Sequence, residues 1–230
     1  MMVLGRPGGL VPGGSIGVFI KALHNQGLFK VEALVGDFYG QNSIGRYRFY
    51  WGDGREGFIA ACAKAVSEHN LSGLNFDFEP SSASCNGTDF PPACSSADDA
   101  PFAKLLSDVR AAINTGSRGA KTVSVDTGQS AIASPAILNA STADQLITMN
   151  TYGDTSDFKI ALPRDIGRCG AARFSLGVCP GCANGSSDIA ERMELATTLG
   201  VQHVSWWSGT SLNDAIWWAA VRKWKNATVA

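Results

Sequence analysis

The sequence is short of charge, and it has no excess of basic residues. Only 17% of the 230 residues are charged, and 19 Lys and Arg face 20 Asp and Glu, which gives a formal net charge of −1. A nucleic-acid partner needs a basic excess to neutralise its phosphates, so the composition argues against one. The sequence also lacks an uninterrupted apolar run of about 18 residues, so no membrane-spanning helix is predicted.

The balance of hydrophobic and charged residues excludes a chain that is disordered as a whole. Hydrophobic residues make up 45% of the chain, whereas a disordered chain combines low hydrophobicity with high charge. A chain of this length buries roughly 70% of its unfolded surface when it folds. No linker, charge run or low-complexity tract interrupts residues 1–230, and a single domain is therefore expected.

A signal peptide is also missing, although other features are typical of secreted proteins. Residues 1–9 have neither a basic start nor an apolar stretch of useful length. Cys85 and Cys94 bracket a loop rich in Asn, Gly and Pro, which favours a disulfide. Asn-x-Ser/Thr sequons begin at Asn70, Asn86, Asn139, Asn184 and Asn226. We expect a disulfide-bonded glycoprotein of the secretory pathway whose natural N-terminus lies upstream of Met1; the alternative is a cytosolic chain with chance sequons.

The remaining cysteines leave alternatives open. Cys62 lies in an apolar helical pattern and is expected to be a buried free thiol. Cys169, Cys179 and Cys182 allow one further disulfide and one free thiol. A zinc site needs four ligands, and only His203 offers a fourth.

Strand-like apolar runs alternate with amphipathic helix-like stretches along the whole chain. The predicted strands are residues 2–4, 30–36, 71–79, 122–126, 146–149, 174–178 and 203–207, and the predicted helices are 15–26, 55–69, 98–114, 136–140, 158–166, 188–199 and 213–224. This alternation indicates an α/β protein with a parallel sheet. A closed (β/α)8 TIM barrel has eight strands and usually about 250 residues. We therefore expect such a barrel lacking its first strand–helix unit. The alternative is an open doubly wound sheet, whose phosphate-binding glycine spacing the residues near Gly8 do not match.

The strand at residues 71–79 carries an unusual polar face. Alternate residues of a strand share a face, so Gly73, Asn75, Asp77 and Glu79 lie together, opposite Leu74, Phe76 and Phe78. Polar side chains that point into a core are costly unless they are hydrogen-bonded or functional. Glu79 ends the strand, where barrel enzymes keep their catalytic groups. Asp77 lies roughly 6–7 Å from it, a pairing that suits Glu79 as a general acid.

The segment Ser72–Glu79 resembles the signature of the family 18 glycoside hydrolases, the chitinase family, written D-G-x-D-x-D-x-E. Gly73, Asp77 and Glu79 match it, while Ser72 and Asn75 replace its first and middle Asp. Thr151 and Tyr152 resemble the family's Met-x-Tyr-Asp segment, with Asp154 one position after the expected Asp. Trp206 and Trp207 end the last predicted strand, where the family places a Trp under the sugar.

The resemblance implies hydrolysis of β-1,4-linked N-acetylglucosamine polymers by a retaining, substrate-assisted mechanism. Glu79 would protonate the glycosidic oxygen, Asp77 would orient the substrate acetamide, and Tyr152 would hold its carbonyl. Asn75 would hydrogen-bond Asp77. The residues implied in substrate binding are Asn75, Trp206, Trp207, Asp154 and Phe38. No metal or organic cofactor is expected, and the partner is an N-acetylglucosamine-containing polysaccharide or glycan bound by a monomer.

Two further expectations concern the surroundings of the site. Aromatic side chains stack on sugars, so some members of the cluster Phe38, Tyr39, Tyr47, Phe49, Tyr50 and Trp51 are expected to line sugar subsites or to pack in the core. Asp126 is expected to face the cleft or to form a structural salt bridge or cap. The alternative function is a non-catalytic carbohydrate-binding barrel or an inert truncated one.

Overall fold

The structure is a computed structural model that describes residues 32–35, 43–78, 97–116, 119–127, 135–139, 142–149, 155–178, 189–206 and 214–228. The chain forms two compact units. The first comprises Met1–Asp126 and Ala133–Asp144, and the second comprises Thr127–Ile132 and Gln145–Ala230. The predicted strand at 2–4 and the predicted helix at 15–26 lie outside the described residues.

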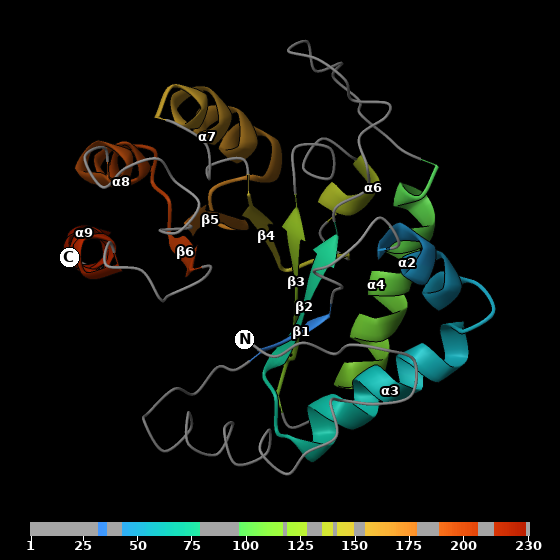
Figure 1. Cartoon of the computed structure of the whole chain (residues 1–230). Coiled ribbons are helices and arrows are strands. Elements are labelled where there is room, and N and C mark those ends of the chain that lie inside the picture. The colour runs from blue at the N-terminus through green and yellow to red at the C-terminus, as the bar shows by residue number, and fades with distance from the viewer. Residues whose placement is uncertain are drawn as a thin grey trace. The chain divides into compact units, whose positions relative to one another are not determined.

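The first unit alternates strands with helices. Its elements are β1 (Glu32–Val35), α2 (Ser43–Trp51), α3 (Arg55–Glu68), β2 (Gly73–Phe78), α4 (Asp99–Asn114), β3 (Thr122–Thr127) and α6 (Pro135–Leu138). The strands lie in the order β1-β2-β3. β1 and β2 are parallel, with Glu32 opposite Gly73. Figure 1 shows α2, α3 and α4 together on one side of these strands.

Aromatic side chains hold this helical layer against β2. Leu74, Phe76 and Phe78 are completely buried. Phe102 of α4 stacks on Phe78 at 3.7 Å between ring centroids, and it meets the ring of Phe76 edge-on at 6.2 Å. Each such ring buries a large apolar area, and aromatic pairs add about 0.5–1.5 kcal/mol beyond that burial. The predicted apolar face of this strand is therefore the face that the helices cover.

The second unit repeats the pattern. Its elements are β4 (Gln145–Thr148), α7 (Thr155–Cys169), β5 (Phe174–Val178), α8 (Ile189–Thr198), β6 (His203–Trp206) and α9 (Asp214–Thr228). β4 pairs in parallel with β5, and β5 pairs in parallel with β6. The Trp224 indole of α9 is buried and donates to the Val201 carbonyl oxygen at 3.2 Å.

These strands confirm the predicted α/β class and the parallel sheet. Strand order follows chain order within each unit. No helix among the described residues is long and apolar enough to span a membrane.

Helix α2 is the element that sequence analysis missed. Its aromatic residues are typical of strands, and the sequence predicts no helix there. Tyr47 and Tyr50 instead lie in the core. Tyr50 stacks on Phe58 of α3 at 4.1 Å between centroids. Of the two readings of this cluster, core packing therefore holds for Tyr47 and Tyr50.

The described cysteines are both free and buried. Cys62 of α3 is the buried thiol that the sequence predicts, and burial raises its pKa to about 12. Cys169 at the end of α7 is the second free thiol, and its Sγ donates to the Asp165 carbonyl oxygen at 2.9 Å. Cys85, Cys94, Cys179 and Cys182 lie outside the described residues, so both predicted disulfides remain predictions.

Candidate functional site

A row of polar side chains lies on the face of β1–β3 opposite the helices; we call it the inner face. Asn75 and Asp77 supply it from β2, and Thr122, Ser124 and Asp126 supply it from β3 at alternate positions. Asn75 is only 9% exposed, and Asp77 is half-buried. A buried polar group is costly without partners, so the partners of this row define what holds it in place.

Asn75 is the centre of the row. Its Nδ2 donates to the Ser124 hydroxyl at 2.9 Å and to an Asp126 carboxylate oxygen at 3.1 Å. Both hydrogen bonds therefore run to β3, whereas the sequence-based expectation was a hydrogen bond from Asn75 to Asp77. The reason is geometric: neighbouring strands lie about 4.8 Å apart, but Asn75 and Asp77 are separated by roughly 6–7 Å along one strand. Asp126 lies on the inner face and accepts a structural hydrogen bond there.

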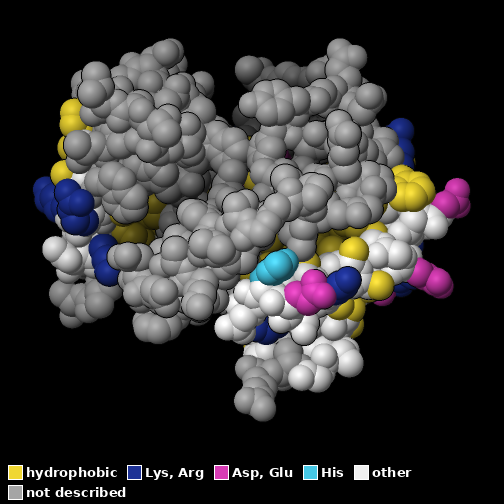
Figure 2. Space-filling model, turned by 60° about the horizontal axis from the view of Figure 1, so that its bottom comes forward, with side chains coloured by type: hydrophobic (Ala, Val, Ile, Leu, Met, Phe, Trp, Pro, Cys, Tyr) yellow, Lys and Arg dark blue, Asp and Glu magenta, His cyan; other side chains and the backbone are white. Residues whose placement is uncertain are grey.

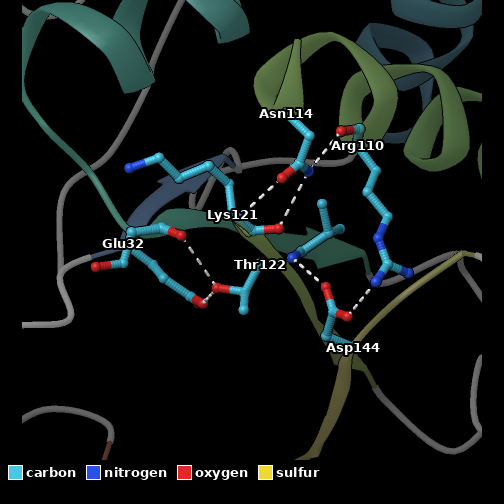
Figure 3. Close-up of polar contacts among 8 residues, drawn as sticks. Glu32, Arg110, Asn114, Lys121, Thr122 and Asp144 are labelled. Carbon is cyan, nitrogen blue, oxygen red and sulfur yellow. Dashed lines mark hydrogen bonds and ion pairs between the residues drawn. The ribbon is translucent and has the colours of Figure 1, made fainter. Parts of the chain in front are cut away.

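Glu32 of β1 completes the row from the other edge. Its carboxylate accepts a hydrogen bond from the Ser124 hydroxyl at 2.6 Å and another from the Thr122 hydroxyl. β2 lies between β1 and β3, so the Glu32 side chain crosses β2. It crosses at Gly73, which is its register partner and carries no side chain. Figure 3 shows the hydrogen bond between Thr122 and Glu32.

Gly73 is needed for this close approach. A Cβ at position 73 would collide with the carbonyl oxygen and the hydroxyl of Thr122. Gly73→Ala is expected to lower the free energy of unfolding by about 1–3 kcal/mol, the usual cost of overpacking, because backbone must move to make room. Urea denaturation measures this loss as a lower midpoint at unchanged slope.

Gly57→Ala is the matched control for that variant. Gly57 lies on α3, where an added Cβ meets nothing within 4 Å. Alanine has the higher helix propensity, so this variant should be as stable as the parent chain or more stable by up to about 1 kcal/mol. Equal stability of the two variants would contradict the role given to Gly73.

A second group of contacts anchors the start of β3 (Figure 3). One carboxylate oxygen of Asp144 accepts the Val123 backbone N–H at 2.9 Å, and the other pairs with Arg110 of α4. The Asn114 side chain bonds both backbone groups of Lys121, at 2.7 and 3.2 Å. These hydrogen bonds fix where β3 begins relative to α4. They thereby fix the positions of Ser124 and Asp126 along the strand direction.

Tyr47 of α2 contacts the backbone of both β1 and β2. Its hydroxyl contacts the carbonyl oxygens of Val35 at 2.9 Å and of Asp77 at 2.7 Å. Burial raises the Tyr47 pKa well above its usual range, and the negative charge of Asp77 raises it further. Tyr47 therefore stays a neutral donor that ties the ends of β1 and β2 together just before Glu79.

The surface of the first unit carries ion pairs between exposed side chains. Figure 2 shows acidic and basic side chains next to one another on the described part of one face. The pair of Lys64 and Glu68 on α3 is an example, with Nζ and Oε1 3.6 Å apart and both side chains exposed. Exposed pairs of this type contribute about 0–1 kcal/mol to stability, so this helix face offers neutral positions for control substitutions.

Among the described residues, no three His, Cys, Asp or Glu side chains are grouped so that they could hold a metal ion.

Only part of the predicted site lies among the described residues. Asn75 and Asp77 share the inner face, as predicted. Trp206 ends β6, and the structure describes its backbone but not its side chain. The other predicted site residues lie outside the described part of the chain: Glu79, Tyr152, Asp154, Trp207 and Phe38.

Three members of the row were not predicted from the sequence, namely Glu32, Thr122 and Ser124. A signal for two of them was present, because residues 122–126 alternate polar and apolar residues as a half-polar strand does. Glu32 is the one charged residue in an otherwise apolar strand, which is a weaker signal. Its partners follow only from the register of three strands.

Comparison with known proteins gives a consistent result for the fold. No protein-family model matches the chain, and no curated protein matches its sequence. Solved structures do match. A family 18 chitinase from Flavobacterium johnsoniae is 13% identical with a TM-score of 0.68, over 95% of this chain and 82% of that one. A chitinase from Chromobacterium violaceum is 14% identical with a TM-score of 0.67, over 94% and 86%.

A chitinase-like agglutinin from Robinia pseudoacacia also matches, at 15% identity and a TM-score of 0.68, over 99% of this chain and 91% of that one. Likeness at this level of identity establishes the fold, while function depends on the residues of the site. The chain therefore has the (β/α) barrel fold of the chitinases, and β2 is the strand that carries the signature-like segment.

Proposed function

We propose that this chain hydrolyses β-1,4-linked N-acetylglucosamine polymers of the chitin type. The observation that carries the proposal is the inner face of β2. There Asn75 and Asp77 share one face, and Glu79 follows the last residue of β2 directly in the sequence, in a protein with a chitinase-like fold. Barrel enzymes place their catalytic residues at the carboxyl ends of such strands, which supports the same assignment.

The proposed mechanism uses the substrate as its own nucleophile, as the resemblance to family 18 implies. Glu79 donates its proton to the glycosidic oxygen, and the bond from that oxygen to the anomeric carbon breaks. The acetamide oxygen of the same sugar forms a new bond to the anomeric carbon, which gives an oxazolinium ion. Water activated by the Glu79 carboxylate then opens this ion with net retention of configuration.

The other site residues have supporting roles in this proposal. Asp77 orients the acetamide and balances the positive charge of the oxazolinium ion, an electrostatic contribution that is large in a site shielded from water. Tyr152 holds the acetamide carbonyl. Asn75, Asp154, Phe38, Trp206 and Trp207 contact the sugars, the aromatic ones by stacking.

Further parts of the proposal concern the setting of the protein. It acts without a metal or organic cofactor, as a monomer, on a polysaccharide or glycan partner and not on nucleic acid or a membrane. Its sequons and its cysteine-bracketed loop support a role in the secretory pathway or outside the cell.

A binding protein without turnover is the second candidate. The structural likeness to a chitinase-like agglutinin favours it, because one fold hosts both kinds of protein. The presence of Glu79 favours the enzyme, since a lectin on this fold has no need of a proton donor at that position.

An assay with three matched oligomers tests the proposal. The chain is expected to cleave N-acetylglucosamine oligomers and to leave glucosamine and glucose oligomers of the same length intact, because only the first carries the acetamide nucleophile. Chromatography of the products measures cleavage, and NMR of the first product should show the retained β-anomer.

Each other outcome of this assay has a clear meaning. Efficient cleavage of glucose oligomers would reject the substrate-assisted mechanism. Specific binding of N-acetylglucosamine oligomers with no turnover would reject the enzyme and support the agglutinin-like alternative.

A further inference from the structure

Glu32 is connected to Asn75 by a chain of hydrogen bonds with a fixed direction. The order is Thr122 and Ser124 to Glu32, and Asn75 to Ser124 and to Asp126, across three strands. A carboxylate has only acceptor oxygens. The Ser124 hydroxyl therefore donates its one proton to Glu32, and its oxygen can only accept a hydrogen bond from Asn75.

The direction of these hydrogen bonds determines which side of the Asn75 amide, oxygen or nitrogen, faces β3. The side of Asn75 that faces β3 meets two acceptors, the Ser124 oxygen and the Asp126 carboxylate, so it must present its two N–H groups there. The amide is planar, and Oδ1 is consequently turned away from β3. A flipped amide would place Oδ1 against two acceptors, and the low polarity of a buried site makes such a mismatch costly.

We infer that Glu32 is a positioning residue of the proposed site: from β1, through Ser124, it fixes the orientation of the Asn75 amide beside Asp77. The inference rests on the proposed function for its catalytic consequence, because Asp77 is the residue proposed to hold the substrate acetamide. A flipped Asn75 would exchange an acceptor for a donor next to that residue. Gly73 makes the arrangement possible, since a side chain there would block the crossing of β2.

Thr122 supplies a matched control within the same cluster. It donates to the Glu32 carboxylate as Ser124 does, but no hydrogen bond joins it to Asn75. If Glu32 only ties β1 to β3, removal of either hydroxyl should have the same effect. If Glu32 acts through Ser124 on Asn75, only the Ser124 hydroxyl matters for the site.

The kinetic test therefore compares Glu32→Gln, Ser124→Ala and Thr122→Val on N-acetylglucosamine oligomers. Glu32→Gln and Ser124→Ala should each lower kcat about tenfold or more with less than a threefold change in KM, since misplacement of a positioning group affects the reacting geometry most. Thr122→Val should keep kcat within twofold of the parent. The double variant Glu32→Gln/Ser124→Ala should be no slower than the slower single variant, because both changes break one path.

A second test does not depend on catalytic activity. The side-chain amide signal of Asn75, assigned by its loss in Asn75→Asp, should exchange slowly with water in the parent chain. Glu32→Gln and Ser124→Ala should speed this exchange at least tenfold, and Thr122→Val should not. This measurement decides the positioning role even if the parent chain hydrolyses nothing, an outcome that would reject the proposed function alone.

Three results would overturn the inference. The first is an unchanged Asn75 amide signal in both Glu32→Gln and Ser124→Ala. The second is an equal effect of Ser124→Ala and Thr122→Val on that signal. The third is an active parent chain in which Ser124→Ala keeps full kcat. If Glu32→Gln does not fold, Ser124→Ala carries the same test, because it removes only the linking hydroxyl.

Discussion

Glu79→Gln is expected to lower kcat by about 10²-fold or more, with little change in sugar binding. Gln keeps the size and polarity of Glu but has no proton to give to the leaving oxygen, and general acid catalysis contributes about 10²–10⁴-fold. Contacts between the sugars and the rest of the site remain. A loss of kcat with an unchanged KM or dissociation constant therefore separates the chemical step from binding.

Glu68→Gln is the control for this variant. It makes the same chemical change on the exposed face of α3, where Glu68 pairs only weakly with Lys64, and it should leave both kcat and stability unchanged. Equal rates for Glu79→Gln and the parent chain would reject Glu79 as the acid. A loss of rate in Glu68→Gln would point to a general effect on folding.

Asp77→Asn should lower kcat on a similar scale, about 10²-fold. The substitution removes the negative charge that balances the oxazolinium ion, and loss of one group that stabilises transition-state charge, such as an oxyanion-hole donor, costs about 10²–10³-fold in kcat. The fold should survive the change, because the Tyr47 hydroxyl contacts the backbone carbonyl of Asp77 and not its side chain. Initial rates on N-acetylglucosamine oligomers, together with a urea unfolding curve, separate the two effects.

The matched control is Asp53→Asn, at an exposed position in the turn between α2 and α3. It changes the net charge by the same amount far from the inner face, so it should leave kcat unchanged. Full activity of Asp77→Asn would mean that the oxazolinium ion needs no counter-charge from β2, and the mechanism proposed for Asp77 would fail.

Most of the helices and strands could be predicted from the sequence because their signals are local. The alternation of polar and apolar residues in β2 placed Leu74, Phe76 and Phe78 on the helix side, and the structure confirms this placement. β5 has the predicted bounds, and α3 ends within one residue of its prediction. Helix α2 was missed because aromatic residues favour strands in isolation, whereas packing of Tyr47 against Phe78 and Phe102 stabilises a helix there.

The sequence by itself determined which residues of β2 share a face, because a strand repeats every two residues wherever it lies. It also placed Asn75 and Asp77 on the polar side, and it predicts that Glu79 ends the strand. Only the tertiary structure decided what Asn75 and Glu32 contact. Those contacts depend on the register of β1, β2 and β3, which are joined by long connections through helices, and no local pattern fixes that register. Packing of the helices, the anchoring of β3 by Asp144, and the missing side chain at Gly73 set it, and they bring Glu32 within reach of Ser124.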